Sequence, residues 1–277
     1  MKKDIVFAAS DGERLRSTIF GQDNLGKGPC IVFVHGFKGF KDWGFWPYMG
    51  NYFADRGYIV VSFNFSHNGV GESLTEFDEL DRFSENTFSR EVREVCEIVD
   101  ACRSGFFGDI GDHRIALLGH SRGGGISLAA ARQKPEVAAV ALWSSVADFS
   151  RYSEKHKERW RKTGHFEVVN QRTGQVMRLN ATLLEDLEEH KGDLLNIEKA
   201  VRELSRPLLI AHGEQDISVT VAEGEKLFEC SDKNRTEFHI IPKTGHTFGI
   251  VHPFAGSSTA LDSVLEKTES FYAKNLK

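Results

Sequence analysis

The stretch Arg114-Ile-Ala-Leu-Leu-Gly-His-Ser-Arg-Gly-Gly-Gly125 joins a short apolar run to a serine that has glycine two positions before it and two positions after it. The apolar run, residues 115–118, is typical of a buried parallel strand. The residues that follow, 126–132, are rich in helix formers. A strand, a sharp turn and a helix are therefore expected to meet at Ser121.

The two glycines, Gly119 and Gly123, complete the pattern Gly-x-Ser-x-Gly. Such a turn holds its central residue in a strained backbone conformation, and strand and helix approach so closely that the flanking positions must lack bulk. The hydroxyl group then stands above the edge of the sheet, at the positive end of a helix dipole, where an oxyanion would be stabilised. The pattern predicts that Ser121 is a nucleophile, and the alternative is a structural serine in a glycine-rich turn.

The composition indicates a soluble globular protein, because 40% of the 277 residues are hydrophobic and 27% are charged. The net charge of −5 and the pI near 6.1 give no sign of a nucleic-acid partner. No apolar stretch approaches the ~20 residues of a transmembrane helix, and the apolar run near the first residue is too short for a signal peptide. We therefore expect a cytoplasmic protein with no membrane partner and no nucleic-acid partner.

The cysteines show no spacing typical of metal ligands, and a chain of this length has no need of a disulfide framework. There are four of them, Cys30, Cys96, Cys102 and Cys230. We expect free, mostly buried thiols, no metal site and no cofactor.

Two kinds of strand are expected. An antiparallel hairpin opens the chain, because strand patterns at 5–8 and 14–20 flank the turn dipeptide Asp11-Gly12. After it, apolar runs of strand length alternate with helical patterns, such as those at 86–103 and 261–271, which predicts a parallel sheet with helices on both faces. The runs lie at 30–34, 58–63, 115–118, 137–143, 207–211 and 236–241. The fold class is therefore α/β, with an eight-stranded, mostly parallel sheet.

One segment breaks the alternation. More than sixty residues separate the sixth expected strand from the seventh, although a strand-helix-strand unit needs about half as many. We place an insertion at 148–206, between core segments 1–147 and 207–277. Within it, residues 166–169 and 175–179 bracket a bend that contains glycine, which predicts a hairpin.

A serine nucleophile needs a general base, and the base needs a partner that fixes its tautomer. In parallel sheets such groups sit on loops after the carboxyl ends of strands. Asp216 follows the seventh expected strand and His246 follows the eighth, so we predict the triad Ser121, Asp216 and His246. Two rivals stay open: Asp148, after the sixth strand, for the acid, and His252 for the base.

The oxyanion of a tetrahedral intermediate needs two hydrogen-bond donors. One is expected to be the backbone N–H of Arg122, directly after the serine. The other is expected from the loop Val34-His-Gly-Phe-Lys-Gly39, where glycines on either side of Phe37 would let its N–H point into the site. The alternative for this loop is a plain glycine-rich turn.

These motifs together resemble the α/β-hydrolase superfamily over essentially the whole chain. The motifs are His35-Gly-Phe37, Gly119-His-Ser-Arg-Gly123, His212-Gly-Glu-Gln-Asp216 and Gly245-His246. The resemblance implies the α/β-hydrolase fold, the same triad and oxyanion hole, and a small cap formed by 148–206 after the sixth strand. Within the superfamily the chain is most similar to small bacterial carboxylesterases, including feruloyl or cinnamoyl esterases, although many relatives carry Gln or Met where this chain has Arg122.

The leading hypothesis is a cofactor-independent carboxylic ester hydrolase that acts on a small-molecule ester through an acyl-enzyme. The alternatives are a serine peptidase acting on short peptides, similar to prolyl oligopeptidase relatives, and a catalytically silent ligand-binding module.

Aromatic residues crowd the expected oxyanion loop, and apolar residues occur in the insertion. We expect these residues to line an apolar or aromatic acyl pocket, unless they only pack the loop and the insertion onto the core. They are Phe37, Phe40, Trp43, Phe45 and Trp46 in the loop, and Trp160, Phe166, Val168 and Met177 in the insertion.

Overall fold

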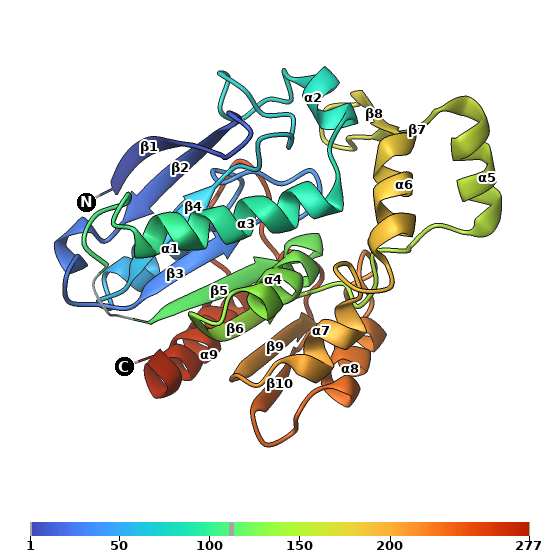
Figure 1. Cartoon of the computed structure of the whole chain (residues 1–277). Coiled ribbons are helices and arrows are strands. Elements are labelled where there is room, and N and C mark those ends of the chain that lie inside the picture. Colours follow the sequence, from blue (N-terminus) through green and yellow to red (C-terminus); the bar gives the residue numbers. More distant parts are fainter. Residues whose placement is uncertain (1, 111–113, 277) are drawn as a thin grey trace.

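The computed structural model describes residues 2–110 and 114–276. Within these residues the central element is an eight-stranded sheet in the order β1-β2-β4-β3-β5-β6-β9-β10 (Figure 1). Its strands are β1 (Lys2–Ala8), β2 (Arg14–Phe20), β3 (Cys30–Val34), β4 (Ile59–Phe63), β5 (Ile115–His120), β6 (Val137–Trp143), β9 (Leu208–Gly213) and β10 (Thr236–Ile241). β2 pairs antiparallel with β1 and β4, and all the other pairs in this sheet are parallel. The predicted eight-stranded, mostly parallel sheet is confirmed.

Helices cover both faces of the sheet. In the described part of the core the helices, including the short 3₁₀ helix η1, are η1 (Gln22–Asn24), α1 (Trp46–Ala54), α2 (Leu80–Ser84), α3 (Phe88–Arg103), α4 (Arg122–Gln133), α8 (Val221–Cys230) and α9 (Thr259–Leu276). Successive residues of a strand point to opposite faces. In β3, Ile31 and Phe33 join the apolar cluster that includes residues of α1 and α9, whereas Val32 and Val34 join the cluster that includes residues of α3 and α4. Burial on both sides explains why the strands read as continuous apolar runs.

Residues 148–206, here called the cap segment, follow β6. The elements of this segment are α5 (Glu154–Thr163), β7 (His165–Val169), β8 (Val176–Asn180), α6 (Ala181–His190) and α7 (Ile197–Glu203). β7 and β8 form an antiparallel pair, so the predicted hairpin is confirmed. In Figure 1, α5, β7, β8 and α6 project beyond one end of the sheet, while α7 packs against α4. That the segment forms a domain of its own stays a prediction.

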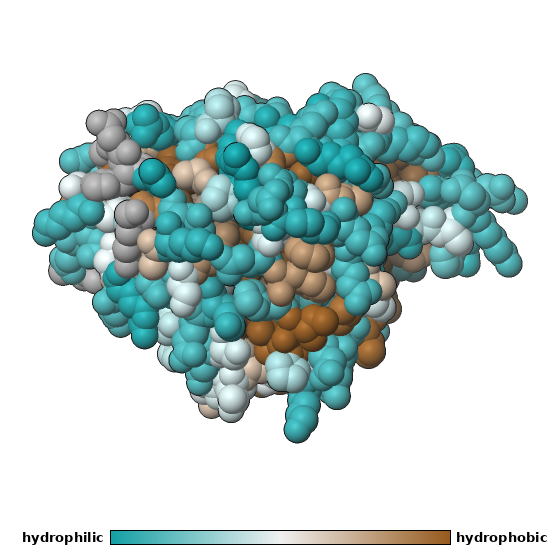
Figure 2. Space-filling view, turned by 90° about the horizontal axis from the view of Figure 1, so that it is seen from below, coloured by the Kyte–Doolittle hydropathy of each residue, from teal (hydrophilic) through white to brown (hydrophobic). Residues whose placement is uncertain are grey.

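The surface seen from below in Figure 2 is mainly hydrophilic, with a compact hydrophobic area near its middle.

All four cysteines are free, as predicted. No helix within residues 2–110 and 114–276 is long and apolar enough to cross a membrane.

Candidate active site

Ser121 occupies the predicted turn between β5 and α4. Its backbone angles are φ 57° and ψ −124°, a strained conformation for a residue with a side chain. A Cβ atom at Gly119 would lie 2.5 Å from the carbonyl oxygen of Gly123, and one at Gly123 would lie 2.3 Å from the carbonyl oxygen of Val34. The Ser121 amide donates a hydrogen bond of 2.9 Å to the carbonyl oxygen of Trp143, at the end of β6. The strand-turn-helix geometry is therefore the one that the glycine pattern predicted.

Asp216 and His246 are in direct contact. Nδ1 of His246 lies 2.7 Å from Oδ2 of Asp216, and the Asp216 side chain is completely buried. Its other oxygen, Oδ1, accepts hydrogen bonds of 2.9 Å from the amides of Ser218 and Val219. Burial alone would raise the pKa of the Asp216 carboxyl, but the contact with His246 and these two amides outweigh burial and hold the pKa below its ordinary value. Asp216 is thus a fixed anion that orients the His246 ring.

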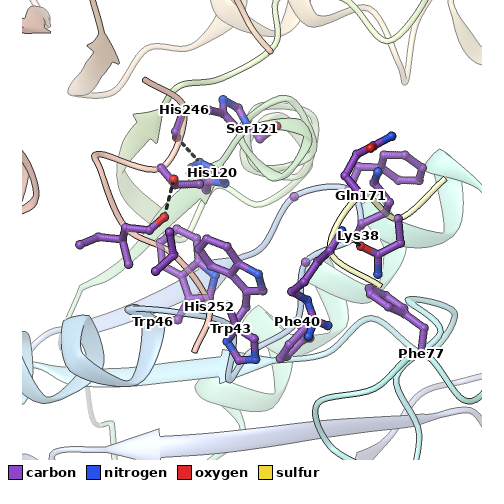
Figure 3. A pocket seen from close by; sticks show the side chains of 18 residues that line it. Lys38, Phe40, Trp43, Trp46, Phe77, His120, Ser121, Gln171, His246 and His252 are labelled. Atoms are coloured by element: carbon purple, nitrogen blue, oxygen red, sulfur yellow. Dashed lines mark hydrogen bonds between the residues drawn. The ribbon is translucent and has the colours of Figure 1, made fainter. Parts of the chain in front are cut away.

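Ser121 and His246 lie together at the wall that separates two cavities. Both residues line a cavity of about 450 Å³ and a second one of about 490 Å³, and Figure 3 shows them at the same end of the first. Nε2 of His120 donates a hydrogen bond of 2.9 Å to the carbonyl oxygen of His246. Burial, aided by the nearby His246 ring, lowers the pKa of His120 to about 3. His120 therefore stays neutral and holds the His246 loop in place.

Asp148 and His252, the alternatives for the acid and the base, make other contacts. The carboxylate of Asp148 accepts a hydrogen bond of 2.7 Å from the amide of Ser150, and this exposed residue lines only the second cavity. Nδ1 of His252 accepts a hydrogen bond of 2.8 Å from the amide of Gly44, and its ring stacks on Trp43. Among the described residues, the histidine hydrogen-bonded to Asp216 is His246.

The loop after β3 abuts the serine. A Cβ atom at Gly36 would lie 2.8 Å from Cβ of Ser121, so only a residue without a side chain fits at this point. The amides of Phe37 and Arg122 flank the contact, and neither donates a hydrogen bond to another described residue. Two unengaged amides beside a serine hydroxyl suit an oxyanion hole, the role that the sequence predicts for both.

The side chain of Arg122 forms a buried network that no sequence pattern indicates. One guanidinium nitrogen lies 2.6 Å from Oε1 of Glu91, in α3. The same oxygen accepts a hydrogen bond of 2.7 Å from Asn86. The guanidinium carbon lies 4.6 Å from the centre of the Phe37 ring and 5.5 Å from that of Phe88. Through its side chain, Arg122 is thus anchored to α3 by the buried carboxylate of Glu91, while its own backbone amide stays unengaged.

The first cavity has aromatic walls and a polar rim from the cap segment. Phe40, Trp43, Trp46 and Phe77 supply the aromatic side chains. The rim comes from residues 170–172, at the bend of the β7–β8 hairpin.

The prediction that apolar residues of the cap segment line the acyl pocket is wrong, as is the same prediction for Phe45. Trp160 and Met177 are buried, with exposed fractions of 1% and 0%, and neither they nor Phe166 and Val168 line either cavity. Phe45 packs against Trp143, with ring centres 6.2 Å apart, instead of facing the cavity. The β7–β8 pair alternates its side chains, so its apolar side packs inward while the bend reaches the site.

No group of three or more His, Cys, Asp or Glu side chains in the described part of the chain is arranged to hold a metal ion. The site instead combines a serine in a strained turn, a histidine hydrogen-bonded to a buried carboxylate, and two unengaged amides. Comparison with protein families matches residues 45–277 to the prolyl oligopeptidase family. The chain belongs to this family. It is accordingly an enzyme, a serine hydrolase.

Solved structures show the same fold along the whole chain. The esterase domain of a protein from Rhodothermus marinus is 21% identical, with a TM-score of 0.66 and complete coverage of both chains. Est1E from Butyrivibrio proteoclasticus with bound ferulic acid is 18% identical, with a TM-score of 0.71 and 98% coverage of both chains. A structure assigned as a dipeptidyl aminopeptidase IV from Bacteroides ovatus is 19% identical with a TM-score of 0.68, and the match covers all of this chain but 36% of that one. These likenesses establish the α/β-hydrolase fold. No curated protein matches the sequence.

Proposed function

We propose that this serine hydrolase is a carboxylesterase that cleaves small-molecule esters through an acyl-enzyme. Ser121 is the nucleophile, His246 the general base, and Asp216 the acid that orients the base. The amides of Phe37 and Arg122 stabilise the oxyanion. The observation that carries the ester assignment is the aromatic cavity of about 450 Å³ that opens beside Ser121.

The contacts support a two-step reaction. Oγ of Ser121 attacks the ester carbonyl carbon while Nε2 of His246 takes its proton, and Asp216 stabilises the resulting imidazolium through the 2.7 Å contact with Nδ1. The carbonyl electrons collect on oxygen, where the two amides face the developing charge. Collapse expels the alcohol, which receives the proton from His246. Water then attacks the acyl-enzyme by the same route and releases the acid.

The lining of the first cavity favours an acyl group over a peptide terminus. Its aromatic side chains, among them Phe40, Trp43 and Trp46, suit an apolar or aromatic acyl chain. None of the described residues that line it is Asp or Glu, so a free peptide amino group would find no anionic partner among them. The relation to prolyl oligopeptidases still supports hydrolysis of short peptides as the second candidate.

A panel of 4-nitrophenyl esters and aminoacyl 4-nitroanilides tests the assignment. We expect turnover of esters, with aromatic acyl groups preferred over acetate, and little turnover of the anilides. Greater kcat/KM on the anilides would favour the peptidase, and turnover of neither class would leave only a binding protein. The Ser121→Ala variant serves as the control for hydrolysis at other sites.

A further inference from the structure

The first cavity carries positive charge without a counterion. Lys38 and Arg172 line it, and the described residues of its lining include no Asp or Glu. Neither side chain forms an ion pair with another described residue, although the chain as a whole has a net charge of −5. Glu76 is close enough to influence His252 electrostatically, but it is exposed and does not line the cavity. Two unneutralised cations therefore face a largely aromatic space.

The second cavity differs in this respect. Its Arg122 is paired with Glu91 at 2.6 Å, and its Arg151 lies 3.0 Å from Glu223. Asp148 adds a negative charge to the same lining. Lys38 lines the second cavity as well, but there Asp148 offsets its charge, and the other two cations already have partners. The second cavity therefore has no comparable excess of positive charge.

Lys38 is held where it faces the cavity. Its Nζ donates a hydrogen bond of 3.1 Å to the carbonyl oxygen of Val169, at the end of β7, and partial burial lowers the pKa of its ammonium group. In Figure 3, Lys38 and Gln171 stand across the cavity from Ser121. Arg172 is the next residue of the hairpin bend and is exposed. An anion placed between the loop after β3 and this bend would meet both cations.

We propose that the aromatic cavity binds an acyl group that carries a carboxylate at the end remote from the ester carbonyl, with Lys38 and Arg172 as the partners of this carboxylate. The proposal rests on the proposed esterase function and narrows its substrate class to monoesters of apolar or aromatic dicarboxylic acids. Aromatic side chains would contact the middle of the acyl group. The two cations would supply selectivity through charge complementarity.

The test compares 4-nitrophenyl esters of 4-carboxycinnamate and of its neutral isostere, 4-carbamoylcinnamate. We expect the wild-type protein to prefer the carboxylate by about tenfold in kcat/KM, because each partly exposed charge pair contributes a factor of a few. Arg172→Gln and Lys38→Gln should each lower this preference by about threefold to fivefold. Glutamine at 38 removes the charge and keeps a side-chain N–H donor, on a side chain one bond shorter. High salt should reduce the wild-type preference.

Arg178→Gln is the matched control, since Arg178 is an exposed cation of the same hairpin that pairs with Glu167 and does not line the cavity. It should retain the wild-type preference. A wild-type preference of one or less would overturn the proposal. So would a loss in the Lys38 and Arg172 variants that is equal for both esters, because a purely structural role predicts that result.

A second measurement separates this proposal from the esterase assignment. Calorimetry with 4-carboxyphenylboronic acid and 4-carbamoylphenylboronic acid needs no turnover, since boron binds Oγ of Ser121 directly. Tighter binding of the carboxylate by the wild type, reduced in Arg172→Gln, supports the anion site even if neither ester is cleaved. Equal binding of the two boronic acids refutes it even if esters are cleaved.

Discussion

Replacing Asp216 by asparagine tests the proposed triad at its most sharply defined contact. The Asn Oδ1 would keep the two hydrogen bonds from the amides of Ser218 and Val219, both 2.9 Å long. Its Nδ2 would then take the place of Oδ2, which lies 2.7 Å from Nδ1 of His246. Two N–H donors cannot face each other at that distance. The His246 ring is therefore forced into the tautomer with its proton on Nε2, the atom that must accept the proton of Ser121.

The expected loss in kcat is on the order of 10⁴, equivalent to about 5 kcal/mol of transition-state stabilisation, since an analogous Asp→Asn change has that effect in a serine protease. The assay is the steady-state hydrolysis of 4-nitrophenyl butanoate, with circular dichroism to show that the variant is folded. Asp148→Asn is the control and should lower kcat by less than about tenfold. Equal losses in the two variants, or a larger loss for Asp148→Asn, would refute the assignment of Asp216.

Three further outcomes are expected. Ser121→Ala should fold normally, because the half-buried serine supplies chemistry rather than packing. Its kcat should fall to a residual ~10³-fold over the uncatalysed rate. Turnover at the wild-type rate would contradict the proposal that Ser121 is the nucleophile. Gly123→Ala should lower the free energy of unfolding, measured in urea, by about 3 kcal/mol or more, since its Cβ would lie 2.3 Å from a backbone carbonyl oxygen. The control Gly192→Ala, with open space around its Cβ, should leave this free energy nearly unchanged. Similar values for both variants would show that the turn relaxes. Burial raises the pKa of Glu94 from 4.5 to about 7, so the unfolded state releases this proton first and the wild type loses stability from this group as the pH rises through that window. Glu94→Gln should remove that loss, about 1.4 kcal/mol per pH unit, and parallel curves of unfolding free energy against pH for the two proteins would contradict the assignment.

The parts of the fold that the sequence predicted are those set by local sterics or by burial on both faces. Gly119 and Gly123 leave no room for a side chain in the turn, so their spacing alone locates Ser121. The strands are recognisable because burial on both faces makes them continuous apolar runs. Asp216 and His246 were predictable for a related reason, since each follows the carboxyl end of a parallel strand.

Other features depend on contacts between distant residues and have no local signature. The pair formed by Arg122 and Glu91 joins positions 31 residues apart, and no pattern near either residue indicates it. The start of α1 has a weak signal, because Trp46 continues the aromatic run of the loop after β3, although Pro47 near the start is a common helix signal. The position of the hairpin bend over the cavity depends on how the cap segment packs, which hydrophobicity alone does not determine.

The order of the strands explains why the proposed triad depends on residues outside it. β5, which precedes Ser121, and β10, which precedes His246, are separated in the sheet by β6 and β9. The loop that holds His246 must therefore cross two strands to reach the serine. The loop passes close to Gly213, the last residue of β9, where a Cβ atom would lie 2.5 Å from the carbonyl oxygen of Gly245. This path is possible because glycine has no Cβ atom. The hydrogen bond from His120 to the His246 carbonyl oxygen holds the other end of the loop, so the residue directly before Ser121 also positions His246.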